Sequence, residues 1–215
     1  MQSCQTESKY RGIGRYSLEL TESMINFGKD KHDFYILLNQ SLSDSIIEIR
    51  AIFEPLIGRG NIITFDSLIG TSGIDNQEHI FDIASELRRL AINQVKPDFV
   101  HINSYFEGFT DQSLTYISSR ENYKTSVTLY DLIPLINEDQ YLQLPIMEAW
   151  YKKRVSDIKN SDLVFAISDS ARNEGIKYGG FNQEKIINIS SAISKNINKN
   201  IADKDETLSK LKIDR

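Results

Sequence analysis

The sequence contains one cysteine, Cys4, so it can form neither an internal disulfide nor a zinc site built from several cysteines. No stretch approaches the roughly 18 apolar residues that cross a membrane, and the polar N-terminus shows no signal peptide. The net charge is -5, which argues against broad nucleic-acid binding because that needs a basic surface. The three histidines have no ligand spacing and predict no metal site. We therefore expect a cytoplasmic protein without a nucleic-acid partner.

The residues that are present indicate an α/β fold. Short apolar runs alternate with helical patterns, which is typical of a parallel sheet with helices on both faces. The predicted strands fall within 33–39, 61–65, 98–102, 125–135, 162–168 and 185–190. The clearest predicted helix has one apolar face, made of Ile80, Ile83, Ala84, Leu87, Leu90 and Ala91. Ligands of such sheets gather at the carboxyl ends of the strands.

The stretch YRGIGRYSLEL, residues 10–20, is the first candidate binding element. Gly12 and Gly14 lack a Cβ, so a backbone there can approach a phosphate closely. The helix that follows would offer free N–H groups and the positive end of its dipole, and Arg11 and Arg15 add charge. The spacing alone is equally compatible with a plain tight turn.

Polar side chains that follow other predicted strands are further candidates. Tyr105 and Glu107 follow one strand, and Glu107 could accept hydrogen bonds from a hydroxylated substrate or stand at a helix N-terminus. Asp131 follows the next strand and could orient a substrate or form an Asx turn. Ser168 is a candidate helix cap. Arg172, in the first helical turn, is a better candidate for anion binding because the helix dipole disfavours a cation there.

Four stretches together carry a family resemblance: YRGIGRYSLEL, HINSYFEGF, VTLYDLIPL and SDLVFAISDSARNE. In this order and spacing, the chain resembles the N-terminal half of a retaining GT-B glycosyltransferase of family 4. That family includes bacterial mannosyltransferases of surface-polysaccharide synthesis. The resemblance implies a Rossmann-like parallel sheet flanked by helices. It assigns residues 1–193 to the acceptor-side domain and 194–215 to an interdomain linker.

The resemblance also implies roles for the candidate residues. Asp131 matches the aspartate of the family's His-Asp pair, with Tyr130 in place of the histidine, and both are candidate catalytic residues. Ser168 and Arg172 match a segment that faces the cleft. Acceptor binding is expected of Tyr105 and Glu107. The donor's diphosphate is expected to lie over Gly12, Ile13, Gly14 and Arg15.

The chain departs from the family pattern at both ends. The family has a strand before the glycines, and here we expect that strand to be absent or reduced to residues 1–4. The family also has a donor-binding domain, which would begin beyond residue 193 and which we expect to be absent from this chain. We therefore expect a fragment of a longer protein, inactive as a transferase by itself. The parent would move a hexose, with mannose as the candidate, from a nucleotide diphosphate sugar to a glycan or lipid-linked acceptor. It would use no metal or other cofactor, and peripheral contact with the inner face of the cell membrane would suit it.

Two other classes of function stay open. A Rossmann-like module could bind a sugar or a nucleotide without catalysis. A nicotinamide-dependent oxidoreductase needs a strand before the glycines and an acidic residue about 20 residues further on. Asp33 lies near that distance, but it precedes its strand, so this alternative is the weakest.

Overall fold

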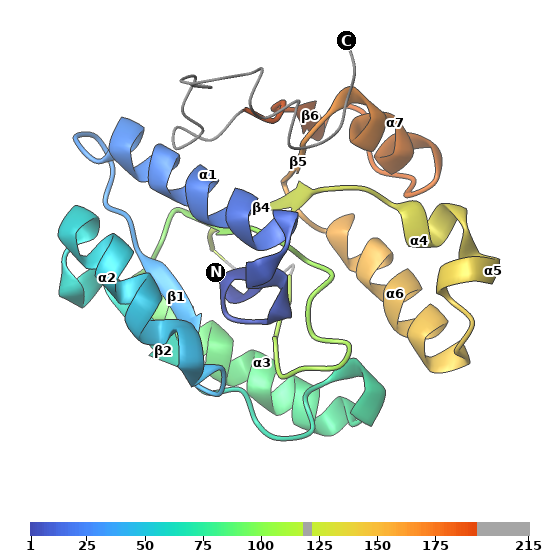
Figure 1. Ribbon diagram of the computed structural model, residues 1–215, viewed down its shortest axis with the longest axis horizontal. Coiled ribbons are helices and arrows are strands. Elements are labelled where there is room, and N and C mark those ends of the chain that lie inside the picture. Colours follow the sequence, from blue (N-terminus) through green and yellow to red (C-terminus); the bar gives the residue numbers. More distant parts are fainter. Residues whose placement is uncertain (118–121, 193–215) are drawn as a thin grey trace, which may run out of the picture.

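The computed structural model describes residues 1–117 and 122–192, and these form an α/β fold (Figure 1). The strands are β1 (Ile36–Asn39), β2 (Ile62–Phe65), β3 (Phe99–Ile102), β4 (Lys124–Leu129), β5 (Leu163–Ala166) and β6 (Ile186–Asn188). The α-helices are α1 (Gly12–Gly28), α2 (Ile46–Ile57), α3 (Glu78–Asn93), α4 (Ile133–Ile136), α5 (Glu138–Tyr141), α6 (Pro145–Ile158) and α7 (Asp169–Lys177). Short 3-10 helices are η1 (Gln2–Cys4), η2 (Glu7–Tyr10), η3 (Ser43–Ser45), η4 (Arg59–Asn61) and η5 (Gly73–Asp75).

All strand pairs in the described residues are parallel. β1 pairs with β2 in one sheet, and a second sheet has the order β3-β4-β5-β6. In the register, Val100 lies opposite Thr125 and Ser126 lies opposite Leu163. The prediction of a parallel α/β fold is therefore confirmed, and the carboxyl ends of β3 to β6 lie along one edge of their sheet.

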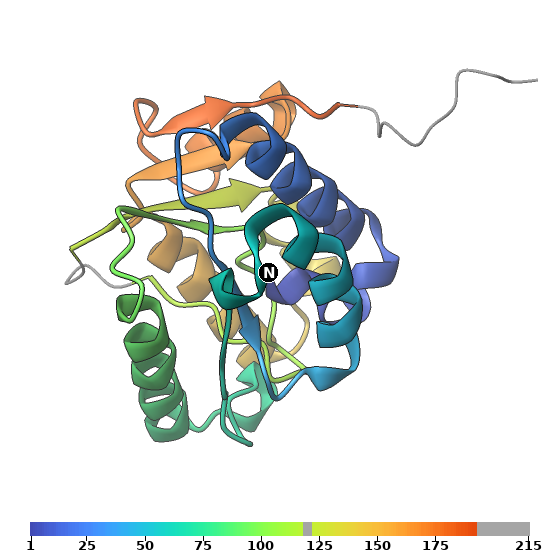
Figure 2. The ribbon, with the colours of Figure 1, turned by 90° about the vertical axis from the view of Figure 1, so that its left-hand side faces the viewer.

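The core has three apolar clusters. The largest joins β3 to β6 with α6 and α7, and includes Val127, Leu129 and Ile158. A second joins α1 and α2 to β1 through Ile25, Leu38 and other residues, and a third lies between β2 and α3. Figure 2 shows β1 between α3 on one side and α2 on the other. β1 and β5 have no exposed position, which explains their near-continuous apolar runs.

The residues before α1 form η1 and η2 and no strand, as the sequence indicates. The Gln5 side chain and the N-terminal ammonium instead bond the open edge of β1. The Gln5 amide donates to the Asn39 carbonyl over 2.8 Å and accepts from the Asn39 N–H over 2.9 Å. The Met1 ammonium donates to the Leu37 carbonyl over 3.1 Å. These bonds satisfy backbone groups that a neighbouring strand would otherwise pair.

Gln2 acts in the same way on the other side of the segment. Its amide nitrogen donates to the Leu114 carbonyl over 2.6 Å, and its oxygen accepts from the Leu114 N–H over 2.7 Å. Figures 1 and 2 both place the N-terminus in the middle of the molecule. The first residues therefore link the β1–β2 pair to the segment that leads to β4.

Two local predictions need correction. The apolar face predicted for α3 is only partly buried: Ala84 and Ala91 are buried, whereas Ile83, Leu87 and Leu90 are 52%, 39% and 49% exposed. The buried stripe instead runs through Ala84, Ser85, Arg88, Ala91 and Ile92. The face with most of the apolar residues is therefore turned away from the core. The strand predicted within 125–135 ends at Leu129, and the segment after it forms the short helices α4 and α5. Pro134 is compatible with α4 because it stands in the first turn, where a proline is tolerated.

Candidate functional site

The glycine pair forms the first turn of α1, so the prediction of a loop before the helix is wrong. Arg11 is the N-cap residue with extended backbone, and Gly12 is already helical. The first intrahelical bond of this turn runs from the Arg15 N–H to the Arg11 carbonyl over 3.2 Å. The N–H groups of Gly12, Ile13 and Gly14 therefore have no carbonyl of the preceding helical turn to bond.

The two glycines have different surroundings. A Cβ on Gly12 would meet nothing within 4 Å. A Cβ on Gly14 would lie 2.8 Å from the Lys9 backbone nitrogen, and closer still to the Lys9 Cα and the Ser8 carbonyl oxygen. Gly14 is therefore required by the packing of η2 against α1, whereas Gly12 leaves its backbone open to solvent. Arg11 and Arg15 are exposed and make no ion pair within the described residues.

Tyr130, at the carboxyl end of β4, lies against this turn. Its hydroxyl is 3.0 Å from the Ser17 hydroxyl and donates to the Ile13 carbonyl over 3.4 Å. Its ring packs edge-to-face on Tyr16, with 5.6 Å between ring centroids. Burial raises the pKa of Tyr130, so the phenol stays protonated at neutral pH. The structure thus brings Tyr130 and the glycine turn together, with the hydroxyl bonded into α1.

Asp131 adopts the Asx turn that sequence analysis left open. Its Oδ1 accepts from the Ile133 N–H over 3.0 Å, and the residue is partly exposed. The N–H of Leu132, which lies between these two residues, donates to Glu174 of α7 over 2.9 Å. The turn therefore fixes the path from β4 into α4. The catalytic role of Asp131 and Tyr130 stays a prediction.

Ser168 and Arg172 begin α7 at the same edge of the sheet. The Ser168 hydroxyl accepts from the Ala171 N–H over 3.1 Å, so Ser168 caps the helix. The Arg172 Nε donates to the Ile186 carbonyl of β6 over 3.2 Å. That bond uses one donor of a guanidinium, which has five N–H groups, so the others can still bind an anion. Their place in a cleft stays a prediction.

Glu107 lies in a loop and not at a helix N-terminus. It is only 6% exposed, and both carboxylate oxygens accept hydroxyl hydrogen bonds. Ser104 donates to Oε1 over 2.9 Å, and Ser8 and Thr6 donate to Oε2 over 3.0 and 3.2 Å. Burial raises its pKa and these bonds oppose that shift. Sequence patterns cannot reveal the contacts with Thr6 and Ser8, because these residues lie 101 and 99 positions from Glu107.

Tyr105 is fully buried, at 0% exposure, so an acceptor cannot reach its side chain in this conformation. The Arg154 guanidinium lies 5.5 Å from its ring and 5.1 and 5.3 Å from the rings of Phe81 and Trp150. Arg154 also donates to the Thr115 carbonyl over 2.6 Å. These contacts are those of a core residue, and a role of Tyr105 in acceptor binding stays a prediction.

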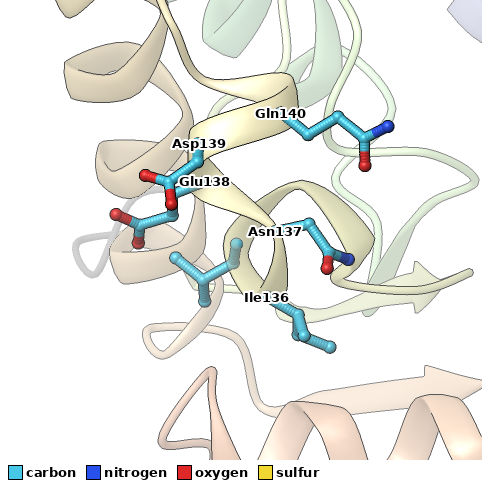
Figure 3. A pocket seen from close by; sticks show the side chains of 6 residues that line it. Ile136, Asn137, Glu138, Asp139 and Gln140 are labelled. Atoms are coloured by element: carbon cyan, nitrogen blue, oxygen red, sulfur yellow. The ribbon is translucent and has the colours of Figure 1, made fainter.

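An open surface hollow lies on the turn between α4 and α5 (Figure 3). It is lined by Leu135, Ile136, Asn137, Glu138, Asp139 and Gln140, and by none of the predicted site residues. Within residues 1–117 and 122–192, no group of three or more His, Cys, Asp or Glu side chains could hold a metal ion. In the same residues, no helix combines the length and apolarity that crossing a bilayer requires.

Comparison with known proteins places these features in context. Three Escherichia coli proteins, each described as serotype-specific mannosyltransferase WbdA, are 32%, 30% and 31% identical to the chain over 197, 166 and 167 residues. These alignments cover 90%, 76% and 76% of the chain. This chain is similar to bacterial mannosyltransferases.

The chain spans 23%, 20% and 20% of the length of these WbdA relatives. No protein-family model matches it, and no solved structure does. The WbdA relatives alone confirm the resemblance to a bacterial mannosyltransferase. The finer assignment to the GT-B class and to family 4 stays a prediction.

Proposed function

We propose that the chain is the acceptor-side half of a glycosyltransferase, which moves a hexose such as mannose from a nucleotide diphosphate sugar to a glycan or lipid-linked acceptor with retention of configuration. The observation that carries the proposal is the similarity to WbdA over 90% of the chain. The GT-B class and a missing donor-binding domain belong to the proposal as well.

The edge of the sheet offers suitable chemistry for this function. The first turn of α1 presents the N–H groups of Gly12, Ile13 and Gly14, and a helix N-terminus favours an anion such as the leaving diphosphate. The exposed guanidinium of Arg15, in the same turn, would add positive charge. Stabilising the leaving group in this way lowers the barrier to transfer. The open backbone at Gly12 lets a phosphate approach without meeting a side chain.

In this proposal the residues near β4 shape the acceptor side. Tyr130 holds the first two turns of α1 through Ile13 and Ser17. Asp131, partly exposed after β4, has one carboxylate oxygen in the Asx turn, and the other is available to a sugar hydroxyl. Nothing in this arrangement favours a stand-alone nucleotide-binding module over the half-enzyme.

Calorimetry with the isolated chain tests the proposal. We expect a mannose trisaccharide to bind, and GDP-mannose and UDP-glucose to bind no tighter than millimolar, because most donor contacts belong to the other half. A transfer assay with GDP-mannose and the trisaccharide should give no product above background. Tight binding of a nucleotide sugar without glycan binding would instead indicate the stand-alone module.

A further inference from the structure

Glu107 is a buried carboxylate that pairs with no cation in the described residues. Burying a charge without a counterion is unfavourable unless hydrogen bonds compensate. Here the compensation comes from the hydroxyls of Ser104, Ser8 and Thr6, at 2.9 to 3.2 Å. An apolar side chain would fill the same space without this desolvation, so the carboxylate has to be explained by what its hydrogen bonds hold in place.

Two of the three donors belong to the turn before α1. Thr6 is the N-cap of η2, where its hydroxyl accepts from the Ser8 N–H over 3.3 Å. The Ser8 carbonyl and Lys9 in turn lie so close to Gly14 that no Cβ fits between them. Glu107 therefore contacts η2, and η2 in turn contacts the first turn of α1.

We propose that Glu107 is a positioning residue that fixes the N-terminus of α1 through Ser8 and Thr6. This inference rests on the proposed function, in which that N-terminus faces the donor's diphosphate. It gives Glu107 a role different from contact with the acceptor. Both carboxylate oxygens are occupied and the side chain is buried, so a sugar hydroxyl could bind only by displacing Ser8 or Ser104.

A double-mutant cycle between Glu107→Gln and Gly14→Ala tests the proposal without any ligand. Alanine at position 14 pushes on Ser8, and glutamine at position 107 loosens Ser8, because a neutral amide oxygen accepts hydrogen bonds more weakly than a carboxylate oxygen does. The second change should therefore relieve part of the first. We expect the unfolding equilibrium constant of the double variant to be at least about threefold smaller than the product of the two single effects predicts.

Ser104→Ala is the matched control. It removes the hydrogen bond to Oε1 and leaves the two bonds to η2 intact, so it should be additive with Gly14→Ala. Amide signals of Gly12, Ile13 and Gly14 should move in Glu107→Gln and stay in place in Ser104→Ala, as read by ¹⁵N NMR. If Glu107→Gln does not fold, Ser8→Ala replaces it in the same cycle, because it breaks the same link from the other end.

Additivity of Glu107→Gln with Gly14→Ala would overturn the proposal, as would equal coupling for the Ser104 control. Unmoved α1 signals in Glu107→Gln, with loss of mannose-trisaccharide binding, would instead assign Glu107 to the acceptor and likewise overturn it. Because the cycle uses no ligand, a chain that binds no glycan would contradict the proposed function and leave the coupling result readable.

Discussion

Replacing Gly14 with alanine is expected to destabilise the protein by about 2 kcal/mol, whereas the same change at Gly12 is expected to be neutral or stabilising. The added methyl at position 14 would clash with the backbone of Ser8 and Lys9, which cannot rotate away as a side chain can. Overpacking of this kind costs about 3 kcal/mol at the upper end of its usual range. The higher helix propensity of alanine returns about 1 kcal/mol.

Gly12→Ala is the matched control, because its Cβ would meet nothing within 4 Å and it keeps only the propensity gain. Urea unfolding followed by circular dichroism gives both free energies of unfolding. In a thermal scan, the Gly14 variant should melt about 4–8 °C below the wild type. Equal stabilities of the two variants, within about 0.5 kcal/mol, would refute the close packing of η2 on α1.

Three further outcomes are expected. Burial, with a smaller contribution from the Met1 ammonium, lowers the pKa of His101 to about 4 from 6.5. The unfolded chain therefore binds more protons than the folded chain between these pH values, so the free energy of unfolding should fall by about 3 kcal/mol as the pH drops from 6.5 to 4. Urea unfolding of His101→Gln, measured across this pH range, should show a flatter profile. Gly108→Ala should lower the free energy of unfolding by about 3 kcal/mol or more, because φ is +92° and a Cβ would meet the Ser113 carbonyl. Gly58→Ala, at φ +82° in open space, should lower it by only about 1–2 kcal/mol in the same measurement. Ser168→Ala should cost about 1 kcal/mol of the free energy of unfolding by removing the cap of α7; an unchanged urea midpoint would argue against that cap.

The parallel fold could be predicted from the sequence because its signals are local. Runs such as 61–65 and 162–168 are short and apolar, and they became β2 and β5 with small shifts at the ends. The first turn of α7 was likewise predictable, since a serine before a helix caps it by contacts within three residues.

The roles of the site residues depend on contacts between distant parts of the chain. Gly14 looks like a phosphate-loop glycine in the sequence, and only the packing of Ser8 and Lys9 shows that it is needed for contact with η2. Tyr105 and Glu107 follow a strand end, as binding residues often do, but aromatic packing around Arg154 buries one and η2 covers the other. No periodicity in the sequence carries such information.

The most direct test of the central claim is a ¹⁵N NMR titration of the chain with a mannose trisaccharide and, separately, with GDP-mannose. The acceptor-side account predicts saturable shifts from the trisaccharide at the carboxyl edge of the sheet around residues 130–131 and 168–172. It predicts only millimolar binding of GDP-mannose, with shifts around residues 12–15. Shifts at the opposite edge, or GDP-mannose binding tighter than the trisaccharide, would contradict it.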